Sequence, residues 1–263
     1  MELTGQTVWI TGASSGIGEA LACELAARGA RLVLSARRGD ELERVRDACS
    51  RPGEHSIAVL DLADPASLEA AARDVLARLG PPDVVVHNAG VSQRARAEDT
   101  DLAVVRRILE IDFFGTVALT LHLLPAMLER GSGRFVVVSS LVGKIGTPLR
   151  SAYSAAKHAL HGWFDSLRAE VHDRGIRVTI VCPGFVRTPL PVHALTGDGT
   201  PQGTMDRAQR HGLDPARVAR RIARAIEREE DELLIAGREG LAVHLHRFFP
   251  GLFRRLIRKA RVT

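Results

Sequence analysis

The feature that most constrains the fold of this chain is a series of short, almost wholly apolar segments separated by stretches with helical character. These segments span residues 7–11, 31–35, 56–60, 83–87, 134–139 and 177–182, and a weaker one spans 232–236. Strands that are covered by helices on both faces of a parallel sheet have continuous apolar runs of this kind. The alternation therefore predicts an α/β fold, with βαβ units wound into one doubly wound parallel sheet.

Several polar residues mark the expected beginnings of helices. Asp64-Pro65 and Asp214-Pro215 each place an N-cap residue before a proline at the first helical position. Asp40 and Glu43 have the spacing of a capping box, so we expect Asp40 to cap the helix after the second strand. Residues 189–211 are rich in Gly and Pro and have little periodicity, which predicts a long mobile loop over a site.

The charge of the chain is concentrated at its C-terminus. Residues 241–263 hold six of the 36 basic residues and none of the 31 acidic ones, so the rest of the chain is close to neutral. We therefore expect a main domain at 1–240 without a nucleic-acid partner, and a basic extension at 241–263. No apolar run approaches the about 20 residues that span a bilayer, and no secretory signal is evident, so we expect a cytoplasmic protein.

A glycine-rich loop follows the first expected strand and opens a helix. Its glycines, Gly12, Gly16 and Gly18, do not have the common G-x-G-x-x-G spacing. The physical role is the same, because glycines permit a tight turn and let the backbone approach a pyrophosphate, while the helix N-terminus offers free N–H groups. With a strand before it and a helix after it, the loop predicts a dinucleotide site rather than an ordinary turn.

The end of the second strand indicates which dinucleotide binds. An NAD site usually places Asp or Glu about 20 residues after the loop, on the ribose 2′-hydroxyl. Here Arg37 and Arg38 occupy that position, and Asp40 is better explained as a helix cap. A guanidinium binds a 2′-phosphate well, so Arg37 favours NADP(H) over NAD(H). The alternative is a solvated pair of surface arginines.

Tyr153 and Lys157 lie at i and i+4 in an expected helix, and therefore on one helix face. A phenol is a poor acid or base at neutral pH, and a neighbouring ammonium stabilises its phenolate form. The chain has only three lysines against 33 arginines, so a lysine at this position suggests a need for a compact charge. An isolated pair of this kind would be a coincidence on a surface helix.

The pair is accompanied by polar residues at the ends of neighbouring strands. Ser139-Ser140 ends the fifth strand, His87-Asn88-Ala89-Gly90 ends the fourth, and Pro183-Gly184 follows the sixth. In doubly wound folds, sites lie along this carboxyl edge. Together with the motifs TGASSGIG, YSAAK and PGFVRT, these residues resemble the short-chain dehydrogenase/reductase family over about residues 4–235.

The resemblance implies a Rossmann fold with about seven parallel strands, NAD(P)-dependent oxidoreductase activity and a role for each matching residue. Tyr153 would be the general acid/base, Lys157 would bind the nicotinamide ribose and favour the phenolate, and Ser140 would orient the substrate oxygen. The cofactor would be held by Gly12, Ser14, Ser15, Gly16, Ile17, Gly18, Arg37, Asp61, Leu62, Asn88, Ala89, Gly90, Tyr153, Lys157, Pro183, Gly184, Val186 and Thr188. No metal is expected. The resemblance also implies a homodimer or homotetramer, which would form through the long helices that carry Asp112 and Tyr153.

Asp112 departs from the family pattern. The family's fourth catalytic residue at this position is an asparagine, which supports a water-mediated proton path to the lysine. An additional carboxylate near Lys157 favours the ammonium and opposes phenolate formation, so we expect an active enzyme with a shifted pH profile.

These features lead to one main functional hypothesis and two alternatives. The first is an NADP(H)-dependent oxidoreductase that interconverts an apolar carbonyl compound and an alcohol. The second is a catalytically silent dinucleotide-binding regulatory or scaffold protein, and the third is a nucleic-acid binder with a vestigial domain.

The C-terminal extension also has two interpretations. Its apolar residues recur at helical spacing as a stripe, interrupted at Pro250-Gly251 and opposed by basic residues. This amphipathic helix either packs on the body or on a partner subunit, or makes peripheral contact with an anionic membrane.

Overall fold

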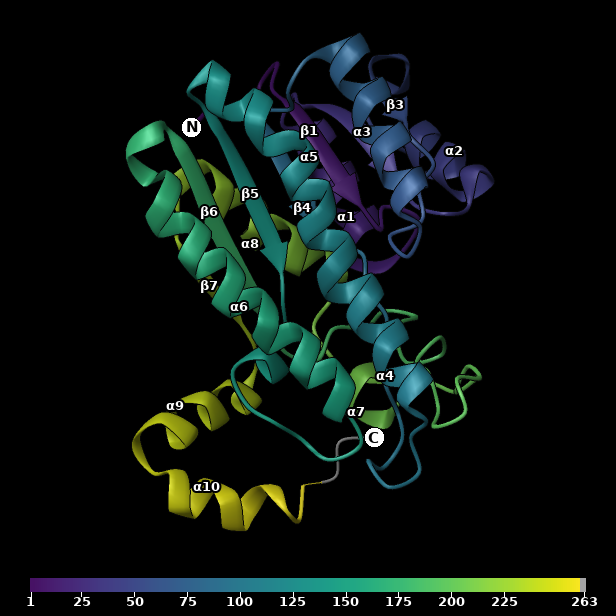
Figure 1. Cartoon of the computed structure of the whole chain (residues 1–263), viewed down its shortest axis with the longest axis vertical. Helices are drawn as coiled ribbons and strands as arrows, with labels where there is room; N and C mark the ends of the chain where they lie inside the picture. The colour runs from purple at the N-terminus through teal and green to yellow at the C-terminus, as the bar shows by residue number, and fades with distance from the viewer. Residues whose placement is uncertain (261–263) are drawn as a thin grey trace.

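The computed structural model describes residues 1–260 and contains one seven-stranded, wholly parallel sheet (Figure 1). The strand order is β3-β2-β1-β4-β5-β6-β7, as expected for a doubly wound fold. The strands are β1 (Thr7–Thr11), β2 (Arg31–Ser35), β3 (Ser56–Ile57), β4 (Val84–His87), β5 (Gly133–Val138), β6 (Ile176–Pro183) and β7 (Glu232–Ile235).

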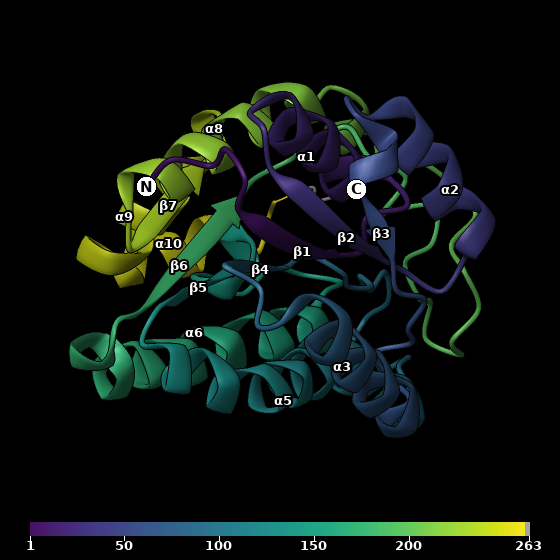
Figure 2. The same ribbon diagram turned by 90° about the horizontal axis from the view of Figure 1, so that it is seen from above.

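Helices connect the strands and cover both faces of the sheet. They are α1 (Gly16–Ala27), α2 (Gly39–Ala48), α3 (Pro65–Leu79), α4 (Leu102–Leu109), α5 (Gly115–Arg130), α6 (Ser151–Val171), α7 (Arg207–Arg210), α8 (Pro215–Arg228), α9 (Leu241–Phe248) and α10 (Pro250–Ile257). As Figure 2 shows, α1, α2 and α8 lie on one side, and α3, α5 and α6 lie on the other. Asp64 and Asp214 cap α3 and α8 through their side chains, as the sequence predicts.

The pleat of each strand divides the core between these two layers. Val8 and Ile10 of β1 point toward the α1 and α8 side, whereas Trp9 between them points toward α3 and α5. All three side chains are completely buried. Both faces of the strand are therefore apolar, which explains why its sequence does not alternate.

The strand order reverses direction between β1 and β4. The chain proceeds outward through β2 and β3 on one side and through β5, β6 and β7 on the other. The connections that leave the carboxyl ends of β1 and β4 diverge to opposite faces, which opens a crevice at this point. The expected ligand site is therefore at the lower end of the sheet in Figure 1.

A long helical run spans residues 102–130 and is made of α4, a π-helical turn (Glu110–Phe114, η2) and α5. By length and composition this run could cross a membrane, although the sequence pattern alone did not indicate it. In the fold, Leu119, Leu123 and Met127 of α5 are buried against the sheet. Core packing therefore accounts for part of its apolar composition.

Two local predictions are wrong. The third strand includes only Ser56 and Ile57, and half-exposed Val59 lies beyond its end. Asp40 does not cap α2, because the helix begins one residue earlier, at Gly39, after the N-cap residue Arg38. Asp40 instead lies in the first turn, where its charge favours the positive end of the helix dipole.

The segment 189–211 is folded against the body rather than standing free of it. Leu195 forms bridges to Gln93 and Pro201. The buried carboxylate of Asp206 accepts two hydrogen bonds from Arg94, at 2.8 and 2.5 Å. A buried ion pair therefore anchors this segment to the body.

The C-terminal extension forms two short helices instead of one. The backbone of Phe249 leaves helical geometry, and Pro250 begins α10 at its first position. The two helices pack on each other at the end of the molecule where the β-strands terminate (Figure 1). Arg261, which belongs to the predicted basic stretch, lies outside the described residues.

Candidate active site

A cleft of about 490 Å³ lies at the carboxyl edge of the sheet. It is lined by most of the residues that the sequence assigned to cofactor and catalysis: Gly12, Ser14, Ser15, Gly16, Ile17, Arg37, Asp61, Leu62, Asn88, Ala89, Gly90, Ser140, Tyr153, Lys157, Pro183, Gly184, Val186 and Thr188. Two predicted residues, Gly18 and Asp112, lie behind this lining. The volume is typical of small-molecule sites.

The glycine loop is shaped by close approaches of backbone to backbone. Gly12 has φ +66°, and a Cβ there would lie 2.7 Å from the Cα of Ala89. A Cβ on Gly18 would lie 2.2 Å from the carbonyl oxygen of Gly12. No side chain fits at either position, so the loop stays tight and the N-terminus of α1 faces the cleft.

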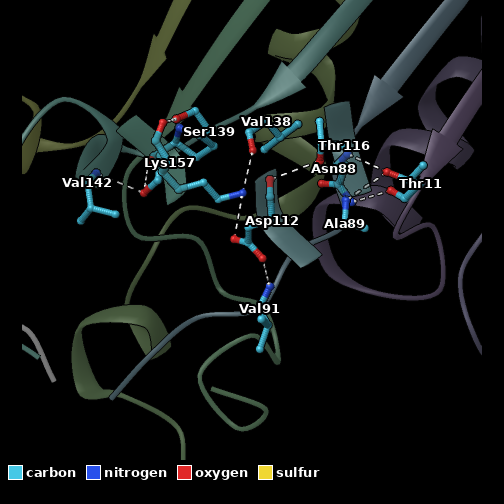
Figure 3. A network of polar contacts seen from close by, with 12 residues as sticks. Thr11, Asn88, Ala89, Val91, Asp112, Thr116, Val138, Ser139, Val142 and Lys157 are labelled. Carbon is cyan, nitrogen blue, oxygen red and sulfur yellow. Dashed lines mark hydrogen bonds and ion pairs between the residues drawn. The ribbon is translucent and has the colours of Figure 1, made fainter. Parts of the chain in front are cut away.

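Asn88 holds the glycine loop to the end of β4 (Figure 3). Its Nδ2 donates to the carbonyl oxygens of Thr11 and Gly12, both at 3.1 Å. The Thr11 hydroxyl in turn accepts from the backbone N–H groups of Asn88 and Ala89, at 3.1 and 3.2 Å. These bonds lock the carboxyl ends of β1 and β4 together and fix the shape of the crevice between them.

Arg37 and Arg38 follow β2 at the rim of the cleft, and both side chains are exposed. Within residues 1–260, neither guanidinium is paired with a carboxylate. Asp40, the nearest acidic residue in sequence, is exposed in the first turn of α2. This end of the cleft is therefore positive and suited to an anionic group.

The first turns of α6 bring Tyr153 and Lys157 to the cleft on one helix face, and both are buried. The Lys157 Nζ lies 5.6 Å from the centre of the Tyr153 ring. This arrangement places a positive charge beside the phenol, as the i, i+4 spacing predicts.

The two serines after β5 have different environments. Ser139 is buried, and its hydroxyl lies 3.1 Å from the Nε2 atom of His161 and 3.3 Å from the carbonyl oxygen of Lys157, to which it donates. Ser140 is partly exposed, and its hydroxyl donates to the carbonyl oxygen of Pro183 at 3.5 Å. The hydroxyl of Ser140 is therefore the one available to a bound molecule.

Asp112 and Lys157 form a buried ion pair at the back of the site (Figure 3). The Asp112 Oδ2 lies 3.2 Å from Nζ, and the two side chains are 0% and 4% exposed. Asp112 Oδ1 accepts from the backbone N–H of Val91 at 2.7 Å, and Nζ donates to the carbonyl oxygen of Val138 at 3.3 Å. Asp112 is in the π-helical turn, a distortion often found at functional sites.

The surroundings of the pair change the pKa values of both Asp112 and Lys157. Burial raises the pKa of Asp112, although the Lys157 ammonium and the Val91 amide oppose this change. Burial lowers the pKa of Lys157, but Asp112 and Tyr153 together outweigh this effect and the net shift is upward. The carboxylate therefore holds Lys157 as an ammonium.

His87, at the end of β4, belongs to the core instead of the cleft. Its Nε2 lies 2.8 Å from the hydroxyl of Thr120, and its ring stacks on Phe135. Complete burial lowers the pKa of His87 to about 3, so the ring is neutral. A neutral aromatic ring fits this position without a buried charge.

The sequence did not identify several residues of the cleft, because they do not belong to the motifs. These are Val91, Arg107, Ile111, Pro189, Leu190, His193, Leu195, Pro201 and Gln209. Six of the nine come from the segment 189–211, whose role over a site was the only signal for them. No group of three or more His, Cys, Asp or Glu side chains suitable for a metal is found in residues 1–260.

Comparison with known proteins gives a consistent result. The family described as short chain dehydrogenase matches residues 6–196. Dehydrogenase/reductase SDR family member 7B of Bos taurus is 43% identical over 258 residues, which cover 95% of this chain and 79% of the relative.

Two solved structures show the same similarity in three dimensions. A short-chain dehydrogenase from Streptomyces avermitilis has a TM-score of 0.82 and 33% identity, covering 97% of this chain and 99% of that one. An alcohol dehydrogenase from the archaeon Thermococcus sibiricus, complexed with 5-hydroxy-NADP, has a TM-score of 0.76 and 28% identity, covering 89% and 97%.

Proposed function

The chain belongs to the short-chain dehydrogenase/reductase family and is an oxidoreductase of that family, and from this premise we propose that it interconverts an apolar carbonyl compound and its alcohol with NADP(H). The observation that carries the proposal is the cleft itself. It brings Ser140, Tyr153 and Lys157 together with the glycine loop at one edge of the sheet.

The residues present fit a nicotinamide dinucleotide. The glycine loop leaves no space for a Cβ at Gly12 or Gly18 and directs the N-terminus of α1 into the cleft, where a pyrophosphate would bind. Asp61 and Leu62 lie toward the adenine end by family analogy, and Pro183 and Thr188 toward the nicotinamide end. When bound, the nicotinamide supplies the hydride in reduction and accepts it in oxidation.

The protein's own groups handle the proton and the substrate oxygen. In reduction, the Tyr153 hydroxyl gives its proton to the carbonyl oxygen as the hydride reaches carbon; in oxidation, the Tyr153 phenolate takes the alcohol proton back. Ser140 donates a hydrogen bond to the same oxygen and orients it. The Lys157 ammonium, held by Asp112, stabilises the negative charge on Tyr153 while its proton is away.

NADP(H) is the preferred cofactor because the end of β2 offers Arg37 and no carboxylate for a ribose 2′-hydroxyl. The similar archaeal alcohol dehydrogenase was solved with an NADP derivative. Dissociation constants for NADPH and NADH, measured by fluorescence titration, test this preference. We expect NADPH to bind at least about tenfold more tightly, a difference of about 1.4 kcal/mol, and Arg37→Ala to remove most of that advantage. Equal or tighter NADH binding contradicts the assignment.

An apolar substrate is supported by the lining near the catalytic residues. The segment 189–211 contributes Pro189, Leu190, Leu195 and Pro201 to the cleft, against His193 and Gln209 as its polar members. Such a lining favours a hydrophobic ketone, aldehyde or alcohol over a sugar.

Turnover of a panel of apolar ketones, aldehydes and alcohols tests the reaction. Wild-type protein should show cofactor-dependent turnover, and Tyr153→Phe should reduce kcat by about 10²–10⁴-fold with little change in cofactor affinity. Equal inactivity of both proteins across the panel, with NADPH still bound, would favour the silent regulatory or scaffold function. The buried carboxylate of Asp112 beside Lys157 is the observation that keeps this alternative in view.

A homodimer or homotetramer is the assembly we propose. Phe114 directly precedes α5 and Leu121 lies within it, and their side chains are 52% and 55% exposed. Helix α5 lies beside α6 (Figure 2). Burial of this face against a second copy would remove the exposed apolar area. Analytical ultracentrifugation of wild type and Leu121→Glu tests the interface, and an unchanged oligomer in the variant argues against it.

A further inference from the structure

The C-terminal hairpin, defined here as α9 and α10 with the turn at Phe249, has a very small core. Helix α9 packs on the turn Arg238–Gly240 (η5), and α10 packs on α9. Phe253 is the one large apolar side chain of the hairpin that is buried, within the described residues, and its ring lies 4.8 Å from that of His246. Leu245 and Ile257 are partly buried, and the other large apolar side chains of the hairpin are mostly exposed.

Most of the exposed apolar residues of the hairpin line one surface. Eleven large hydrophobic side chains are exposed in residues 1–260, and five of these belong to the hairpin: Leu241, Phe248, Phe249, Leu252 and Leu256. Phe248 is 70% exposed and Phe249 is 63% exposed. Four of them, Leu241, Phe248, Phe249 and Leu256, line an open groove between the two helices together with Leu245 and Ile257. A concentration of this kind marks an interaction site rather than ordinary surface.

The rest of the hairpin is strongly basic. Arg247, Arg254, Arg255, Arg258 and Lys259 are all exposed, and residues 241–263 contain no acidic side chain. None of these five cations forms an ion pair within residues 1–260. On α10, Leu252, Phe253, Leu256 and Ile257 share one arc, while the basic residues occupy the opposite arc and its margins. The hairpin therefore combines an apolar face with uncompensated positive charge.

Two kinds of occupant would cover an apolar face, and the charge distinguishes them. If a second copy of the chain covered it symmetrically, the positive rims of the two copies would meet without an acidic partner. An anionic bilayer surface satisfies both features, because its acyl region takes up apolar side chains and its headgroups neutralise Lys and Arg. We propose that the α9–α10 hairpin is an interfacial membrane-binding element for bilayers that contain anionic lipid.

The hairpin is connected directly to the wall of the cleft. Glu239, in the turn that leads into α9, accepts a hydrogen bond from the backbone N–H of Phe185 at 3.3 Å. Its carboxylate also packs against Gly184, which lines the cleft. The hairpin lies at the end of the molecule where the strands terminate (Figure 1), and the residues that line the cleft follow the carboxyl ends of the same strands. On a membrane, the cleft is therefore held near the lipid surface, a consequence that rests on the proposed apolar substrate.

Vesicle cosedimentation tests the binding without any measurement of activity. The full chain is mixed with vesicles of phosphatidylcholine alone, or with about a third of phosphatidylglycerol added. We expect binding to the anionic vesicles, and weaker binding at high salt. Phe248→Ser with Phe249→Ser should lower the partition coefficient at least about tenfold. Arg254→Gln with Arg255→Gln should lower it about fivefold for each charge at low salt.

Matched variants elsewhere on the surface control for general effects. Leu79→Ser removes a 43% exposed apolar side chain at the end of α3, and Arg217→Gln with Arg220→Gln removes two exposed cations of α8. Both should bind vesicles as wild type does. Circular dichroism melting checks that every variant is folded, which is expected because the substituted side chains are exposed.

The proposal is overturned if wild-type protein does not bind the anionic vesicles, or if the double phenylalanine variant binds as well as wild type. It is also overturned if the phenylalanine substitutions reduce the mass of the protein in solution while vesicle binding is absent, because the second copy is then the occupant. If wild-type protein binds the anionic vesicles but shows no turnover, the proposed function is refuted and the membrane-binding proposal stands.

Discussion

The buried carboxylate of Asp112 gives the sharpest test of the catalytic arrangement. Asp112→Asn keeps the shape of the side chain and the oxygen that accepts from the Val91 N–H, but removes one negative charge. The lost charge is 3.2 Å from the Lys157 Nζ, which is itself 5.6 Å from the centre of the Tyr153 ring. The substitution therefore changes the electrostatics of the site with little change in its geometry.

The size of the effect follows from these two distances. They place the Asp112 oxygen within about 9 Å of the phenol ring, where two unit charges interact by about 1–2 kcal/mol at an effective dielectric constant of about 20–40. That energy corresponds to about one pH unit. Removal of the Asp112 carboxylate makes the electrostatic potential at Tyr153 and Lys157 more positive. The pair then releases its next proton at lower pH, however that proton is shared between the two groups.

The assay is the pH dependence of kcat/KM for oxidation of an alcohol substrate at saturating cofactor. Oxidation requires the deprotonated pair, so the midpoint of its rising limb should move about one unit toward acid in Asp112→Asn. Asp83→Asn is the matched control, because Asp83 lies at the opposite end of β4, where it accepts from the Thr7 N–H and pairs with Arg130. An unchanged midpoint, or a shift toward alkali, refutes the reasoning and leaves Asp112 with a structural role only.

Three further measurements follow from the buried groups. Burial lowers the pKa of His87 to about 3 and of His161 to about 4, below the ordinary 6.5. As pH falls, these histidines are therefore protonated in the unfolded chain before they are protonated in the folded one. The free energy of unfolding should fall as pH drops below about 6.5. Urea denaturation at pH 7 and pH 5 should show up to about 2 kcal/mol lost per histidine, and a flat profile contradicts the assignment. Gly18→Ala places a methyl group 2.2 Å from the carbonyl oxygen of Gly12. It should weaken NADPH binding at least about tenfold, or about 1.4 kcal/mol. The control Gly162→Ala places its methyl group in open space and should leave NADPH binding unchanged. Asp206→Asn removes the carboxylate that pairs with the buried guanidinium of Arg94 and should lower the free energy of unfolding by about 3 kcal/mol in urea denaturation; a loss below about 0.5 kcal/mol contradicts this.

The parallel sheet and its site edge were predictable because they depend on local patterns with one physical solution. A continuous apolar strand must be covered on both faces, and parallel strands deliver all their carboxyl ends to one edge. Once Gly12, Ser140 and Tyr153 were assigned to those ends or to the helices after them, their meeting in one cleft followed from topology. The order of the strands confirms this reasoning.

The remaining features depend on contacts between residues far apart in sequence. Arg94 and Asp206 are separated by 112 positions, and nothing near either residue indicates that they form a buried ion pair. The Gly- and Pro-rich composition between 189 and 211 therefore predicted mobility without revealing the anchor. The stripe of the C-terminal extension has the same periodicity whether its apolar face is packed or exposed, so only the structure shows that Phe248 and Phe249 stand open.

These long-range contacts converge at the end of β6. Phe185 donates its N–H to Glu239 at the base of the hairpin, and its carbonyl oxygen accepts from the N–H of Leu213, where the covering segment rejoins the body. Its ring lies 5.8 Å from the guanidinium of Arg150, which is held by Asp206. Because Gly184, the preceding residue, lines the cleft, these contacts fix one wall of the site to both the segment that covers it and the basic hairpin. The segment 189–211 and the C-terminal hairpin, whose packing the sequence did not predict, are thus both attached to the carboxyl end of β6, which it did predict.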